Sequence, residues 1–220
     1  MNKLSIILIG LLIGVLVIGS CDNKELEIEK TQNFACSVGC NYYESVLIDR
    51  NSIDWKNEDN LWIAASKTSP SSPNNHNNLG DMYGRWGNKQ KALEEFQTAI
   101  QLKPNYGDAY HNMANTYLEL GRVDKALENY ENAARFNPNL WQSYQNIAAI
   151  YFQQKKYDKS LEYIQKAIQI NPKNLNLHVN LGVIYLSTGE KEKAKQIFTQ
   201  VLSQDPQNQL ARQGLLEVSK

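Results

Sequence analysis

The chain has 220 residues, of which 23 are basic and 23 are acidic, so its formal net charge at pH 7 is zero. Hydrophobic residues make up 42% of the chain, an ordinary share for a globular protein. Nucleic-acid-binding proteins usually carry a stripe of basic residues. Because basic and acidic residues are balanced here, we expect no nucleic-acid partner.

The N-terminal residues 1–20 differ in composition from the rest of the chain. An apolar run extends from Leu4 to Ile18, directly after the basic Lys3. Its length suits the apolar region of a signal peptide and falls short of the roughly 20 residues of a membrane-spanning helix. We interpret the segment as an export signal. An uncleaved membrane anchor, which leaves the remaining chain on the same outer side, is the alternative.

The segment ends in Ile18-Gly19-Ser20-Cys21. This sequence resembles a bacterial lipobox, in which an aliphatic residue and two small residues precede a cysteine. By that resemblance residues 1–20 are a lipoprotein signal peptide, and Cys21 becomes the first residue of the mature chain, with lipid on its thiol and amine. Several acyl chains anchor a protein stably, whereas a single chain is marginal. The resemblance therefore implies an exported, membrane-anchored lipoprotein on the periplasmic or outer face of the cell envelope.

Residues 21–58 are expected to form a tether and a cysteine-containing segment. The tether, Asp22 to Lys30, is rich in charge and lacks an apolar stripe. Cys36 and Cys40 follow, and because disulfides persist in exported proteins, a local disulfide between them is one interpretation. Two free structural thiols are another, and redox or metal chemistry is a third. The sequence contains no Cys-x-x-Cys motif and no histidine near these two cysteines, so it does not support the third interpretation. We therefore expect no metal and no cofactor.

A helix is predicted between Asp59, which can cap it, and Pro70, because proline disfavours helical geometry in the residue before it. Trp62 and Ala65 occupy the aromatic and alanine places of the second helix in the repeat described next. Residues 59–72 are therefore interpreted as a degenerate half-repeat that closes the N-terminal end of a stack.

Four prolines set a period of 34 residues in the following part of the chain: Pro104, Pro138, Pro172 and Pro206. Self-similarity at this period indicates stacked supersecondary units. Residues 73–208 divide accordingly into the units 73–106, 107–140, 141–174 and 175–208.

Each unit carries the spacing of two amphipathic helices joined by a turn. The two apolar stripes of the first unit are His76, Leu79, Gly80 and Tyr83, then Ala92, Phe96 and Ala99. The turns between the helices are expected at Gly87, Gly121, Lys155 and Gly189. Neither helix can bury its stripe alone, so the units must stack.

This pattern resembles the tetratricopeptide repeat, with Leu-Gly, Tyr, Ala, Phe, Ala and Pro at that family's places over about two thirds of the chain. The departures are tolerable in packing: Lys155 at a turn, Ser160 and Val201 for alanine, and Ile164 for the aromatic residue. The resemblance implies an all-α fold, a right-handed α-solenoid of four helix pairs. Residues 209–220 are expected to form the capping helix that an open-ended solenoid requires.

Catalytic chemistry has little support in the sequence. The three histidines are His76, His111 and His178, and the first and last occupy core places too far apart to meet in an extended stack. No nucleophile motif and no glycine-rich phosphate loop is present. Units that contact only their neighbours offer a long surface rather than one deep pocket, which favours binding over enzymatic activity.

The first helices of such arrays line the concave side, and one column of places there is uniform: Asn78, Asn112, Asn146 and Asn180. An asparagine amide both donates and accepts, so the column can pair with the backbone of an extended peptide, similar to the asparagine ladders of some tetratricopeptide and armadillo-type proteins. Alternatively, the asparagines are uniform only because repeats that arise by duplication keep identical residues without a functional reason. The equally uniform Lys91, Lys125, Lys159 and Lys193 are interpreted as a solvated row.

The predicted peptide-binding residues are Asn78, Asn112, Asn146, Asn180, Asn115, His111, Gln145, Phe152, Val183 and Leu186. The lysines of the carboxylate clamp of chaperone-cofactor repeats are replaced by Asn77 and Gln142, so an acidic C-terminal peptide is not expected.

These features together predict a non-catalytic adaptor at the cell envelope that binds a protein or peptide segment in its groove. The alternative is a self-assembling structural envelope protein that oligomerises through its repeats. The apolar places near Phe152, Val183 and Leu186 fit either, because exposed apolar area marks an interface.

Overall fold

The computed structural model describes residues 6–10, 15–19 and 58–219, which fall into two compact units, Met1–Ser69 and Pro70–Lys220. The first unit contains the strands β1 (Ile6–Gly10) and β2 (Val15–Gly19), which pair antiparallel, and the helix α3 (Glu58–Thr68). No helix among the described residues combines the length and apolar character needed to cross a membrane. The predicted sites at Cys21, Cys36 and Cys40 lie outside the described residues.

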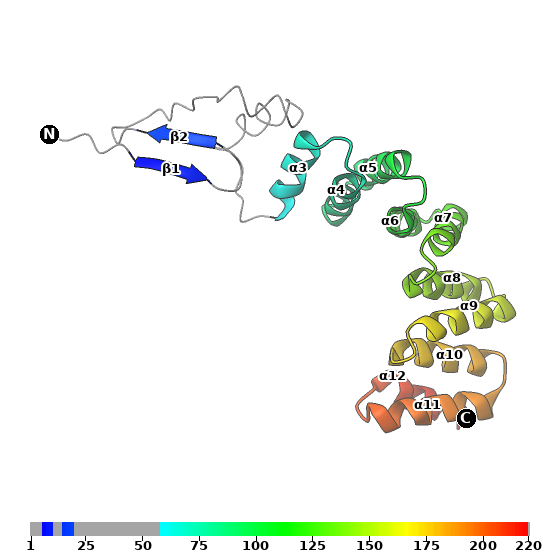
Figure 1. Ribbon diagram of the computed structural model, residues 1–220. Coiled ribbons are helices and arrows are strands. Elements are labelled where there is room, and N and C mark those ends of the chain that lie inside the picture. Colours follow the sequence, from blue (N-terminus) through cyan, green and yellow to red (C-terminus); the bar gives the residue numbers. More distant parts are fainter. Residues whose placement is uncertain (1–5, 11–14, 20–57, 220) are drawn as a thin grey trace. The chain divides into compact units, whose positions relative to one another are not determined.

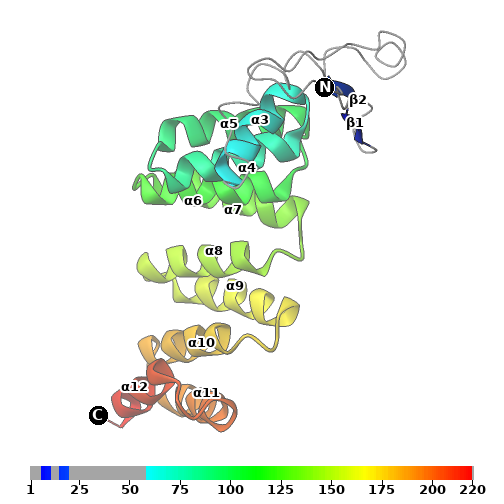
Figure 2. The ribbon, with the colours of Figure 1, turned by 90° about the vertical axis from the view of Figure 1, so that its left-hand side faces the viewer.

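The second unit consists of helix pairs that follow one another along a curved stack, as the ribbon of this unit in Figures 1 and 2 shows. Its helices are α4 (Pro73–Arg85), α5 (Lys89–Leu102), α6 (Gly107–Glu119), α7 (Val123–Phe136), α8 (Trp141–Gln153), α9 (Tyr157–Ile170), α10 (Leu175–Ser187), α11 (Lys191–Gln204) and α12 (Gln209–Val218). Each helix packs against the next along the chain, and α12 packs against both α10 and α11. The predicted solenoid of four helix pairs with a capping helix is confirmed.

Local sequence explains where these helices begin and end. Ser72 and Asn88 accept hydrogen bonds from the backbone N–H groups three residues ahead, which caps α4 and α5. The turn inside each pair requires one residue with positive φ: Gly87 at 79°, Gly121 at 70°, Lys155 at 58° and Gly189 at 83°. Glycine adopts this left-handed conformation without steric cost. Lys155 adopts it although it has a side chain, which is uncommon.

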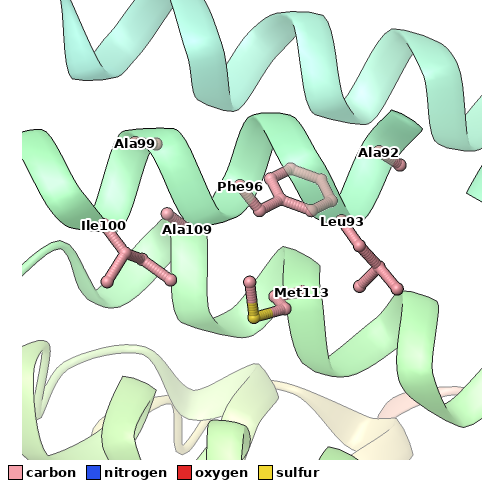
Figure 3. Close-up of a cluster of buried hydrophobic side chains, with 7 residues drawn as sticks. All are labelled: Ala92, Leu93, Phe96, Ala99, Ile100, Ala109 and Met113. Carbon is pink, nitrogen blue, oxygen red and sulfur yellow. The ribbon is translucent and has the colours of Figure 1, made fainter. Parts of the chain in front are cut away.

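The core is a chain of clusters that join neighbouring helix pairs. Figure 3 shows one of them, in which Leu93 and Ile100 of α5 reach toward α6 and Met113 of α6 lies between them. The next clusters join α6, α7 and α8, then α8, α9 and α10, then α10, α11 and α12. The first three clusters each draw on two repeats, and the last draws on the fourth repeat and the capping helix, so burial of the apolar stripes depends on stacking.

Close approach within a pair depends on the small residue in the first helix. A Cβ atom added at Gly80 would lie 2.6 Å from Cε1 of Phe96, and one added at Gly182 would lie 2.6 Å from Cε1 of Phe198. Phe198 also packs against Gly214 of α12, where an added Cβ would lie 2.4 Å from its ring. The capping helix is therefore held by the same aromatic side chain that closes the last repeat.

Candidate functional site

The predicted column of asparagines lies half-buried along α4, α6, α8 and α10. Asn112 donates from Nδ2 to Oδ1 of Asn77 in the preceding repeat at 3.0 Å, and Asn146 donates to Oδ1 of Asn115 at 3.4 Å. Asn78 accepts from Nδ2 of Asn77 at 3.5 Å. Asn112 and Asn146 of the column therefore link successive repeats, a role that was not predicted for them.

A polar network fills the space between the second and third repeats. The hydroxyl of the fully buried Tyr130 donates to Oδ1 of Asn115 at 2.6 Å, and the ring of His111 lies 5.5 Å from that of Tyr130. Nδ1 of His111 lies 2.8 Å from Oγ of Ser143, which is also fully buried. This network joins α6, α7 and α8.

Burial sets the charge state of two members of this network. It lowers the pKa of His111, with a smaller opposing effect of Asp108, and it raises the pKa of Tyr130 to about 12. Both side chains are therefore neutral near pH 7, because their charged forms would lose hydration in this position. The network supplies hydrogen bonds and no charge.

An apolar pocket of about 200 Å³ opens between α8, α9 and α10. Gln145, Phe152 and Val183 from the predicted site line it, together with Asn180, and Ile164 and Ser160 of α9 contribute as well. Leu186, predicted with the same group, packs instead against the core cluster of α10, α11 and α12. The structure thus brings four of the predicted residues into one pocket.

A second pocket of about 290 Å³ lies between α4, α5 and α6 and is lined by charged residues, so we call it the charged pocket. Its charged residues form the ion pairs Arg85–Asp81, at 3.3 Å between Nε and Oδ2, and Lys89–Glu119. Nζ of Lys89 also donates to the backbone oxygen of Gly84 at 3.0 Å. Lys89 and Glu119 were absent from the predicted set, because the repeat pattern gave no reason to pair places in neighbouring repeats.

The two pockets occupy the same place in the repeat, two repeats apart. The corresponding lining residues are Asp81 and Ala149, Gly84 and Phe152, Arg85 and Gln153, Phe96 and Ile164, Asn112 and Asn180, and Asn115 and Val183. Hollows in this position are therefore a property of the stack, whereas their chemistry is set by individual residues.

The described residues offer no candidate metal site. Within the described ranges no group of three His, Cys, Asp or Glu side chains comes together. Nδ1 of His76 lies 2.7 Å from Oε2 of Glu95, and its Nε2 lies 2.9 Å from the oxygen of Pro70. Nε2 of His178 lies 2.8 Å from the oxygen of Pro172. These two histidines therefore connect helices to neighbouring loops and helices.

Comparison with known proteins identifies the repeats. Tetratricopeptide repeat families match residues 107–140 and 151–217, and a TPR repeat family matches residues 87–121. A search of curated protein sequences finds no match.

Similar solved structures share the fold at low sequence identity. They include YrrB, described as a TPR protein with an unusual peptide-binding site, at 17% identity over 71% of this chain and 90% of that chain, with a TM-score of 0.60. MamA from Desulfovibrio magneticus RS-1 is 20% identical over 67% of this chain and 84% of that chain, with a TM-score of 0.58.

A third similar structure is a tetratricopeptide repeat protein from Parabacteroides merdae ATCC 43184. It is 23% identical over 73% of this chain and 64% of that chain, with a TM-score of 0.61. Sequence matches and fold agree, and residues 87–140 and 151–217 of this chain are therefore tetratricopeptide repeats.

Proposed function

We propose that this chain is a non-catalytic adaptor that binds an extended segment of a partner protein along α4, α6, α8 and α10, the groove face. The observation that carries the proposal is the recurrence of open pockets at one repeat place on this face. Tetratricopeptide repeats generally serve as interaction scaffolds, and a protein of similar fold, YrrB, is described as having a peptide-binding site. Regularly spaced hollows suit a ligand that is itself regular and extended.

The asparagine column supplies the means to hold a peptide backbone. Asn112 and Asn146 each use one amide N–H in the stack, and an amide has a second N–H and a carbonyl oxygen with two lone pairs. Asn180 lines the apolar pocket directly. Backbone contacts to such amides give affinity without reading sequence, so side-chain selectivity would come from the pockets.

Site-specific photocrosslinking in native membranes tests this role on the full chain. A photoreactive amino acid at Gln153, which is exposed beside the apolar pocket, is expected to yield a discrete crosslinked segment of a partner. The matched control carries the same group at Gln165, exposed on α9. Identical products from both positions, or none from Gln153, would contradict groove binding.

Substitution of the asparagines adds a second measurement. Asn112→Ala and Asn146→Ala are expected to reduce the crosslink, but each also removes a hydrogen bond within the stack, worth about 0.5–1.5 kcal/mol. The crosslinking yield must therefore be compared with thermal unfolding of the same variants. An undiminished yield in both folded variants would remove the asparagine column from the binding site.

Membrane anchoring is the second part of the proposal. It is supported by the lipobox-like Ile18-Gly19-Ser20-Cys21 after an apolar N-terminal run. Mass spectrometry of the purified membrane-bound protein is expected to find a mature chain that begins with a lipidated Cys21. An intact Met1 in the membrane fraction would contradict lipidation and favour the uncleaved anchor.

Self-assembly through the repeats is the second candidate function, and one feature of the capping helix favours it. Leu210 and Leu216 of α12 are 61% and 67% exposed at the C-terminal end of the stack. Large exposed apolar side chains at an open end can join two stacks. Light scattering of the full chain in detergent, over a range of concentrations, is expected to show oligomers that Leu210→Ser/Leu216→Ser disperses. A monomer at every concentration would exclude this function.

A further inference from the structure

The floor of the apolar pocket differs from the same place in the other repeats. Ile164 stands where the other repeats have an aromatic residue: Phe96, Tyr130 and Phe198. Ser160 stands where they have alanine, and its fully buried hydroxyl donates to the backbone oxygen of Ala148 at 2.8 Å. The floor is therefore aliphatic, and its one polar group already has a partner.

The preceding interface shows how a ring at the same place of the repeat is held by the protein itself. Between α6 and α8 the ring of Tyr130 is fully buried, and its hydroxyl donates to Oδ1 of Asn115. The residues at these two places in the third repeat are Ile164 and Ala149. The third repeat thus lacks both the aromatic ring and the amide that holds it.

The walls of the apolar pocket also suit a ring and do not suit a charge. Phe152 and Val183 supply apolar surface, and 38% of Val183 is exposed. The polar lining groups besides Ser160 are neutral amides, Gln145, Gln153 and Asn180. A charged side chain would lose hydration here without gaining a partner of opposite charge. The charged pocket two repeats earlier provides the contrast, because both of its ion pairs border the same hollow.

We propose that the apolar pocket binds an aromatic side chain, phenylalanine or tyrosine, from an uncharged stretch of the partner segment. The ring rests on Ile164 between Phe152 and Val183, and the amide of Asn180 at the edge pairs with the neighbouring backbone of the segment. This inference rests on the proposed adaptor function and names the residue type that its groove selects.

The probe for the first experiment is N-acetyl-phenylalaninamide, added to the full chain in detergent with its isoleucine and valine methyl groups isotope-labelled. The methyl signals of Ile164, Val183 and Ile184, all of which line the pocket, are expected to shift and saturate. The N-acetyl amides of lysine and glutamate serve as charged probes of similar size, and are expected to leave these signals in place. Equal shifts from all three probes, or none from the aromatic one, would overturn the proposal.

The second experiment fills the pocket from within. The double variant Ala149→Asn/Ile164→Tyr reproduces in the third repeat the arrangement of Asn115 and Tyr130 in the second. It is expected to weaken binding of the aromatic probe by about tenfold or more, because a ring of the protein then occupies the space. Gln169→Tyr, which adds the same residue at an exposed place on α9, is the matched control and is expected to bind as the unmodified chain does.

A further variant keeps the test decisive if the filled variant does not fold. Val183→Glu changes a partly exposed wall residue and puts a charge beside the ring, so it is expected to weaken the aromatic probe while helical content is retained. Undiminished binding of the probe to Val183→Glu, or to a folded Ala149→Asn/Ile164→Tyr, would overturn the aromatic pocket.

Photocrosslinking from Gln153 separates this inference from the adaptor function. If the partner segment still crosslinks in full yield to the filled variant, the groove binds a segment but the aromatic pocket is wrong. If the probe binds the pocket and no segment crosslinks in native membranes, the adaptor function is wrong and the pocket selects rings in another context.

Discussion

The charged pocket and the apolar pocket share a position in the repeat and have opposite chemistry. Arg85 and Asp81 border the first, and Gln153 and Ala149 hold the equivalent places in the second. In the same two repeats, Ala99 and Ala167 are fully buried at one shared core place. The comparison shows that core places fix the geometry of the stack, while groove places change independently.

The ion pairs of the charged pocket illustrate this independence. In the Arg85–Asp81 pair the side chains are 52% and 57% exposed, and in the Lys89–Glu119 pair 28% and 55%. Pairs with such exposure contribute about 0.2–1 kcal/mol at most, since water screens them. Their removal would therefore take the charge out of the pocket and change the stability of the stack little.

The largest effect is expected from truncating a core residue that also lines a pocket, which tests the division into core and groove places most directly. Phe96 is 2% exposed, packs over Gly80 and lines the charged pocket. Phe96→Ala is expected to lower the free energy of unfolding by about 3–5 kcal/mol, because it removes a buried ring and leaves a cavity. Denaturant unfolding followed by circular dichroism measures this. Gln97→Ala, at the exposed neighbouring place, is the control, and an equal effect of both would contradict the division into core and groove places.

A smaller effect is expected where a glycine and a ring meet. In Gly80→Ala the new Cβ would lie 2.6 Å from Phe96, so we expect a loss of about 1–3 kcal/mol from overpacking. The double variant Gly80→Ala/Phe96→Ile reproduces Ala148 and Ile164 of the third repeat, and its loss should be smaller than the sum of the single losses.

Gly84 supplies a matched control for this cycle. It lies in the same helix, and an added Cβ would meet nothing within 4 Å. Gly84→Ala is therefore expected to stabilise the chain, by up to about 1 kcal/mol, through helix propensity alone. If Gly80→Ala and Gly84→Ala had the same effect in thermal unfolding, contact with Phe96 would not explain why Gly80 is a glycine.

Much of the stack could be predicted from the 34-residue period, because a repeat specifies which side chains share a face. The turn positions at Gly87 and Lys155 and the capping role of α12 followed from it. The hydrogen bonds between individual polar atoms could not be predicted from the period. Asn112 was predicted to face a ligand, and its amide also bonds to Asn77 of the preceding repeat, a contact that depends on the exact offset of two helices.

The uniform lysines of the second helices also have contacts that the repeat period did not predict. They are exposed as expected, but each ammonium group also lies over the tyrosine of its own repeat. The distances to the ring centroids are 5.2 Å for Lys91 and Tyr83, 5.5 Å for Lys125 and Tyr117, 5.0 Å for Lys159 and Tyr151, and 5.2 Å for Lys193 and Tyr185. Both columns were visible in the sequence, but periodicity alone gave no distance between them.

The polar network that contains His111 is expected to make the stability of the chain depend on pH. Because burial lowers the pKa of His111, the unfolded chain takes up a proton more readily than the folded chain. The free energy of unfolding should therefore fall as the pH drops below about 6.5, the ordinary value for histidine, and be fully present above it. His111→Gln retains hydrogen bonding toward Ser143 without a charge change, so its stability should depend less on pH across this window. Denaturant unfolding near pH 7.5 and pH 5, on both proteins, measures the difference, and identical pH dependence would contradict the assignment to His111.

The smallest expected effect concerns a feature that all four repeats share, the cation–π contact between a lysine of the second helix and a tyrosine of the first. Lys125→Met keeps much of the side-chain volume and removes the charge over Tyr117, so we expect a loss of about 0.5–1 kcal/mol, typical of such contacts at exposed sites. Lys195→Met, at an exposed place of α11 outside the row, is expected to change stability by less. In a Tyr117→Leu background the effect of Lys125→Met should largely disappear, because the interaction requires the ring. If it persists there, the uniform lysines act through the solvent-exposed helix surface, and the contact with tyrosine is incidental to the stack.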